Sequence, residues 1–150
     1  YELEARTIIT FFDKLTLSAV GKVGTISEIE NPIPASKLFF AGGIDSNRAY
    51  GYKRMGVTLS STTFGKVGGS SMANLSLEAN YPLTEDLYAA VFSDNTTLNI
   101  ESFKLLDEII SSAGIGLRYV TPIGPIKVDF GMNIEDRSQH TLHFQLGQSF

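Results

Sequence analysis

The chain has 150 residues, the length of one ordinary domain, and its 43% of hydrophobic residues and 14 glycines fit a folded chain. Its formal net charge of −4 is mild and spread along the sequence, so nothing in it indicates a nucleic-acid partner. The absence of cysteine excludes a disulfide scaffold and a thiolate metal site.

Apolar and polar residues alternate in segments of about ten residues, the length with which a tilted strand crosses an outer membrane. In chain order, the segments are residues 1–12, 15–23, 73–81, 87–94, 112–121, 126–133 and 141–150. Short connections between several of them, such as the Asp13-Lys14 turn, indicate antiparallel neighbours. The pattern therefore predicts an all-β fold with about seven antiparallel strands.

Two architectures fit this alternation, a membrane-spanning β-barrel and a soluble β-sandwich, because each buries only one face of its strands. No apolar run approaches the roughly 18 residues that a membrane helix needs. Short turns alternate with longer links at 26–70, 95–111 and 134–140, as periplasmic turns and extracellular loops do in bacterial outer-membrane barrels. This asymmetry favours the barrel. An odd number of strands indicates part of a larger wall, since single-chain bacterial barrels use even numbers.

The link 95–111 carries apolar residues at helical spacing. They are Ile100, Phe103, Leu106 and Ile110. The spacing predicts either a short amphipathic helix over the barrel or a flap packed on neighbouring loops. Both alternatives need the same pattern, so the residues alone do not separate them.

The long link contains an unusual combination of residues within 38–56, LFFAGGIDSNRAYGYKRMG. An aromatic pair and a Gly-Gly turn lead to a lone arginine, Arg48, which a loop that only connects strands does not need. The stretch resembles the sixth-extracellular-loop signature FxGGxxSxRGY of the outer-membrane assembly-factor barrels, the BamA-like and TamA-like superfamily, also described as the bacterial surface antigen family. The matching residues are Phe40, Gly42, Gly43, Ser46, Arg48 and Tyr50, and Ala49 stands where the family has glycine.

The segments that follow, GGSSMANLSLEANYPL, VFSDNT, SAGIGLRYVTPIGPIKVDFG and HFQLGQSF, resemble the family's later strands. The resemblance implies a loop that enters the barrel lumen, with Arg48 held there by inward-facing carboxylates. The latch that it implies consists of Arg48, Glu78, Asp94, Tyr50, Gly42 and Gly43.

The cost of burying a charge and the geometry of a guanidinium group both fit such a latch. An arginine in a lumen that is partly screened from water requires carboxylate partners, and its planar fork can bind two of them at once. Glu78 shares its strand parity with Ser76, so it points inward. Asp94 shares its parity with Phe92, which leaves its direction open. The residues alone favour a solvated loop arginine, whereas the resemblance favours the latch.

The last segment resembles the terminal signal of outer-membrane proteins, an alternating strand that ends in an aromatic residue. Phe144 and Phe150 belong to its lipid-facing row, and Gly147 interrupts it. A glycine inside a strand weakens pairing and permits a bend. In the family this strand pairs poorly with the first one and forms a lateral seam. The residues alone equally allow Gly147 as a packing accommodation.

Nothing in the sequence favours an enzyme, a cofactor or a metal site. His140 and His143 are three residues apart on a predicted strand, so they face opposite sides and cannot share a metal ion there. The sequence contains neither a G-x-S-x-G elbow nor a Walker-type phosphate loop. We therefore expect no catalytic activity.

The resemblance implies that residues 1–150 form the C-terminal portion of a barrel of about sixteen strands in the bacterial outer membrane, with 26–70 as a long extracellular loop. It implies assembly and insertion of other β-barrel proteins through the lateral seam, without nucleotide. Expected partners are outer-membrane lipid, unfolded outer-membrane clients, and periplasmic assembly lipoproteins or partner subunits. The alternatives are a two-partner secretion transporter of the same superfamily and a passive porin-like channel. The unpaired edges of the isolated fragment also predict either a homo-oligomer or a sheet that closes on itself with altered pairing.

Overall fold

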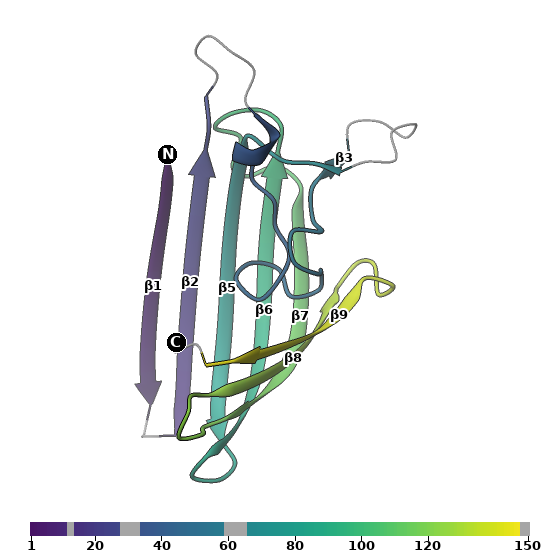
Figure 1. Cartoon of the computed structure of the whole chain (residues 1–150). Coiled ribbons are helices and arrows are strands. Elements are labelled where there is room, and N and C mark those ends of the chain that lie inside the picture. Colours follow the sequence, from purple (N-terminus) through teal and green to yellow (C-terminus); the bar gives the residue numbers. More distant parts are fainter. Residues whose placement is uncertain (12–13, 28–33, 59–65, 148–150) are drawn as a thin grey trace.

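The computed structural model describes residues 1–11, 14–27, 34–58 and 66–147. Seven strands form one antiparallel sheet in the order β1-β2-β5-β6-β7-β8-β9 (Figure 1). These strands are β1 (Glu2–Phe11), β2 (Leu15–Thr25), β5 (Ser71–Pro82), β6 (Leu87–Asn99), β7 (Ile109–Tyr119), β8 (Ile126–Asn133) and β9 (His140–Leu146). The all-β antiparallel fold is thus confirmed. The described residues include no helix that is long and apolar enough to cross a membrane.

The strands meander along the sheet, so every strand pairs with the next wall strand in the chain. The short connections after β5 and β7 lie at one end, and the long connections lie at the opposite end (Figure 1). The sheet curls, and β8 and β9 run steeply across the direction of β1, β2 and β5 in this view. One face of the sheet is therefore concave, and the long loop between β2 and β5 lies against it.

Burial is inverted relative to a soluble domain. Among the described residues, fourteen polar or charged side chains are buried against six apolar ones, whereas soluble cores are mainly apolar. The outward rows of the strands carry the apolar side chains. They include the exposed residues Leu75, Leu77, Ile115, Leu117 and Phe130. Polar inside and apolar outside is the distribution expected of a membrane barrel wall.

The long loop has its own small apolar cluster. Ala41, Met55 and Met72 are buried together, and Phe39 and Tyr50 pack against them. Within the loop lie a single turn of 3-10 helix, η1 (Ala35–Lys37), and a two-stranded ribbon. The ribbon pairs β3 (Val57–Thr58) with β4 (Lys66–Val67). The cluster seats the loop on the inner face of β5, because Met72 belongs to that strand.

Of the two alternatives for the link between β6 and β7, the amphipathic helix is wrong. β6 continues to Asn99 and β7 begins at Ile109, so only a short stretch of turns and bends remains. Phe103 has a φ of 63°, which a right-handed helix excludes. The hydroxyl of Ser71 on β5 donates instead to the carbonyls of Glu101 and Lys104, at 2.7 and 2.9 Å. The link is thus folded by polar contacts with β5, not by its apolar periodicity.

Candidate functional site: a charge cluster on the inner face

The arginine loop, residues 38–56, turns sharply before it reaches the sheet. Gly42 and Gly43 have φ values of 101° and 105°, in the left-handed region that favours glycine. A Cβ at Gly42 would also collide with the carbonyl oxygen of Gly51. The amide of Gly42 donates to the Ser46 hydroxyl (2.9 Å), and the amide of Gly43 donates to the carbonyl of Tyr50 (2.9 Å). These contacts close the loop into a tight turn.

At the tip of this turn, Arg48 projects into the concave face and is 5% exposed. Its Nε lies 2.8 Å from Oδ2 of Asp94, and its Nη2 lies 2.8 Å from Oδ1 of the same carboxylate. The Arg48 amide adds a third bond, 3.0 Å, to Oδ2. Such a bidentate pair is strong and directional. Asp94 lies within β6, in the same buried row as Phe92 and Thr96, so it points inward, and it is fully buried.

The same guanidinium contacts three further groups on the wall. Its Nη1 donates to Oε2 of Glu78 on β5 at 2.5 Å and lies 3.5 Å from Oδ2 of Asp129 on β8. Its Cζ stacks 3.4 Å from the ring centroid of Phe92 on β6, a cation–π contact. Arg48 is therefore bound from three strands at once.

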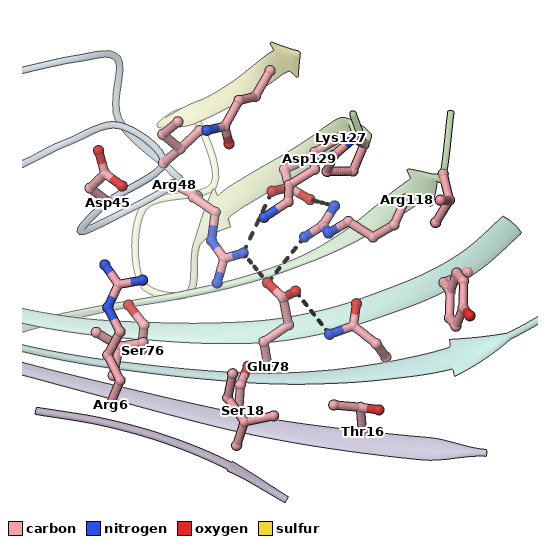
Figure 2. Close-up of a pocket in the computed structure, with 18 of the residues that line it drawn as sticks. Arg6, Thr16, Ser18, Asp45, Arg48, Ser76, Glu78, Arg118, Lys127 and Asp129 are labelled. Carbon is pink, nitrogen blue, oxygen red and sulfur yellow. Dashed lines mark hydrogen bonds and ion pairs between the residues drawn. The ribbon is translucent and has the colours of Figure 1, made fainter. Parts of the chain in front are cut away.

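Arg118 on β7 completes the arrangement. Its Nη2 donates to Oε2 of Glu78 at 3.0 Å, and its Nη1 donates to Oδ1 of Asp129 at 2.5 Å. Figure 2 shows Glu78 between the two guanidinium groups, with Asp129 beside both. We call these five residues the charge cluster. Its members are Arg48, Glu78, Asp94, Arg118 and Asp129. Arg118 and Asp129 are not among the site residues that the sequence predicted.

Glycines on the inner face make room for the charge cluster. A Cβ at Gly114 would collide with the Phe92 ring, and one at Gly116 would collide with the Asp129 carboxylate. A Cβ at Gly131 on β8 would collide with the Arg48 carbonyl oxygen. None of these three glycines was among the predicted site residues.

The charge cluster holds three carboxylates and two guanidinium groups. All of its members except Asp94 line a cavity of about 500 Å³, together with Lys127 (Figure 2). Burial alone would lower the pKa of Arg48, but the hydrogen bond and charge of Asp94, followed by those of Glu78, outweigh it and raise that pKa above its ordinary value. Arg48 thus stays cationic. The described residues contain no cluster of His, Asp or Glu suited to a metal ion. The arrangement binds and orients the arginine loop.

The remaining predicted site residues lie elsewhere. Tyr50 is half-buried, and its hydroxyl accepts a 2.8 Å hydrogen bond from the side-chain amide of Asn133 on β8. Phe144 is 69% exposed on the outward row of β9. Gly147 follows the last residue of β9 with a φ of 78°. Phe150 lies outside the described residues. Ala49, in place of the family's glycine, is buried and has no positive φ, so its backbone tolerates a side chain.

Fold and site together define a class of protein, the wall of an antiparallel outer-membrane β-barrel with an arginine-bearing loop bound to its inner face. The Omp85 superfamily domain matches residues 1–150. The chain belongs to the Omp85 superfamily, and it is an outer-membrane protein.

Relatives agree with this assignment. The chain is 30% identical over 132 residues to the outer membrane protein assembly factor BamA of Nitratidesulfovibrio vulgaris, a match that covers 81% of this chain and 16% of that protein. It also resembles the crystal structure of BamA from Haemophilus ducreyi lacking POTRA domains 1–3, with a TM-score of 0.69 and 20% identity. That likeness covers 96% of this chain and 33% of the other, and it shows the shared fold.

Proposed function

We propose that the chain is the C-terminal part of an outer-membrane barrel that assembles and inserts other β-barrel proteins. The observation that carries the proposal is the arginine loop, bound through Arg48 to the inner face of a sheet whose family includes an assembly factor of this kind. In this assignment residues 26–70 form an extracellular loop, and the short turns face the periplasm.

The proposed mechanism uses the two end strands of the sheet. β1 and β9 stand at opposite ends of the strand order, and each has one pairing partner among the described residues. A strand edge with unpaired N–H and C=O groups can template an incoming strand. The client gains backbone hydrogen bonds and lipid contact as it pairs, so the reaction needs no nucleotide. No bond is made or broken, and we assign no catalytic residue.

In this mechanism the charge cluster fixes the curvature of the wall. Arg48 joins the loop to β5, β6 and β8, and Arg118 joins β5 and β8 across the concave face. A wall held in this curve keeps its end strands in place for a client. Proposed partners are outer-membrane lipid, unfolded outer-membrane proteins and periplasmic assembly lipoproteins.

Complementation in a depletion strain tests this function with the full-length protein. If the proposal holds, depletion lowers the levels of many unrelated outer-membrane barrels, and the wild-type gene restores them. An Arg48→Ala variant that reaches the membrane at normal levels should restore them poorly. Loss of a single secreted polypeptide would instead indicate a two-partner secretion transporter. Normal client levels combined with lost solute permeability would indicate a passive channel.

A further inference from the structure

The end strand β9 touches the arginine loop as well as its neighbour β8. The hydroxyl of Thr141, on the inward row of β9, donates to the carbonyl oxygen of Ala49 at 2.9 Å. Nε2 of His143, two residues along the same row, lies 3.1 Å from the carbonyl oxygen of Arg48. A carbonyl oxygen only accepts, so Nε2 carries a proton in this contact. Two side chains of β9 thus bind the loop's backbone.

A glycine on β8 permits this approach. Gly131 is the register partner of Thr141, and a Cβ at Gly131 would collide with the Arg48 carbonyl oxygen. The loop backbone at Arg48 and Ala49 therefore lies directly on the β8–β9 hairpin. Both loop residues are buried, so their carbonyl groups require donors from the protein.

Arg48 consequently contacts the wall through both its side chain and its main chain. Its guanidinium is held by Glu78 on β5 and Asp94 on β6, while its carbonyl oxygen is held by His143 on β9. Strands β6, β7 and β8 separate β5 from β9 in the sheet. A single loop residue therefore connects the centre of the sheet to its last strand across the concave face.

β9 has few other fixed contacts. It pairs with β8 along one edge, and the described residues supply no strand for its second edge. Its outward row is exposed. That row contains Leu142, Phe144 and Leu146. The hydrogen bonds from Thr141 and His143 are contacts of β9 beyond its pairing with β8, and they join it to the arginine loop.

We propose that Thr141 and His143 are positioning residues that fasten the end strand β9 to the docked arginine loop, so that the docked state of Arg48 controls how firmly β9 is held. The inference deepens the proposed function, and its consequence for client assembly rests on that function. The coupling itself does not, because it is a property of the fold that can be measured without any client.

Hydrogen exchange followed by mass spectrometry on the full-length protein in lipid nanodiscs tests the coupling. The double variant Thr141→Val and His143→Phe removes both donors while keeping side chains of similar size. We expect the amides of β9 to exchange about tenfold faster, the effect of losing hydrogen bonds to buried carbonyl groups, with β5 unchanged. Arg48→Ala should also accelerate exchange in β9. Thr141→Ser keeps the donor, and His140→Phe changes the outward row, so both should exchange like wild type.

The outcomes separate the coupling from the proposed function. Unchanged exchange in β9 of the double variant overturns the coupling, even if Arg48→Ala abolishes client assembly. Exchange that rises in β6 but not in β9 of Arg48→Ala overturns it as well. Faster exchange in β9 of both variants supports the coupling whatever happens to assembly. Normal assembly by both variants would then count only against a role of loop docking in the proposed mechanism, and the assembly function itself would stand.

Discussion

Arg48 makes three hydrogen bonds to the carboxylate of Asp94, two from its guanidinium and one from its own main-chain amide. The two guanidinium bonds fix the plane of the side chain, and the amide bond fixes the backbone that carries it. Asp94 is fully buried, so the pair is shielded from water and salt. A contact of this kind holds the arginine loop in one position.

Arg48→Lys should destabilise the folded protein although the charge is retained. A lysine ammonium is a point donor and cannot reproduce the fork that binds Asp94 and Glu78 together. Losing one or two hydrogen bonds to buried charged groups should cost about 2–4 kcal/mol of unfolding free energy. Urea unfolding in detergent, followed by the heat-modifiable shift on electrophoresis, measures it. Arg54→Lys, at an exposed position of the same loop, is the matched control and should leave the midpoint unchanged.

Arg48 and Arg118 should be energetically coupled, because both donate to Oε2 of Glu78. In a double-mutant cycle with Arg48→Ala and Arg118→Gln, we expect an interaction free energy of about 1–2 kcal/mol. The measurement is the unfolding free energy of the four proteins. Strictly additive effects would mean that the two guanidinium groups act independently and that the charge cluster is not one unit.

Gly131→Ala should displace the arginine loop, since the new methyl group would occupy the position of the Arg48 carbonyl oxygen. We expect a destabilisation of about 1–3 kcal/mol, typical of overpacking. The control is Gly21→Ala on β2, where a Cβ meets no atom within 4 Å. Equal stability of the two variants would show that the loop backbone does not lie against β8.

The isolated chain of 150 residues should associate through its end strands in detergent. β1 and β9 each present an edge without a partner among the described residues, and such edges recruit other chains. Size-exclusion chromatography with light scattering should therefore give a dimer or a larger oligomer. A monomer whose β9 amides exchange as slowly as those of β6 would contradict this prediction.

Strand alternation predicted most of the wall, because successive residues of a strand point to opposite faces, and the two faces of this wall differ in polarity. It placed Glu78 inside and Phe144 outside, as the structure has them. It stopped β6 at Asp94, where the outward row turns polar. The structure extends the strand because Asn95 pairs with Leu75 on β5 and with Ser111 on β7. The length of a strand depends on such partners.

The contacts across the concave face could not be predicted from the sequence. Arg118 meets Glu78 although β6 lies between their strands, and this depends on how far the sheet curls. His143 was correctly separated from His140, but its contact with the Arg48 carbonyl oxygen depends on where the loop docks. Alternation reports which face a side chain occupies, and it contains no information about distances between non-neighbouring strands.

Cysteine accessibility in the native outer membrane tests the central claim, that the arginine loop is docked inside the wall by Arg48. Ser46→Cys lies at a buried loop position and Tyr52→Cys at one that is 75% exposed, and these 150 residues contain no other cysteine. A membrane-impermeant maleimide should label Tyr52→Cys quickly and Ser46→Cys slowly. Adding Asp94→Asn should make Ser46→Cys label quickly, because Arg48 loses its charged partner. Rapid labelling of Ser46→Cys with Asp94 intact would contradict a loop that is held in the lumen.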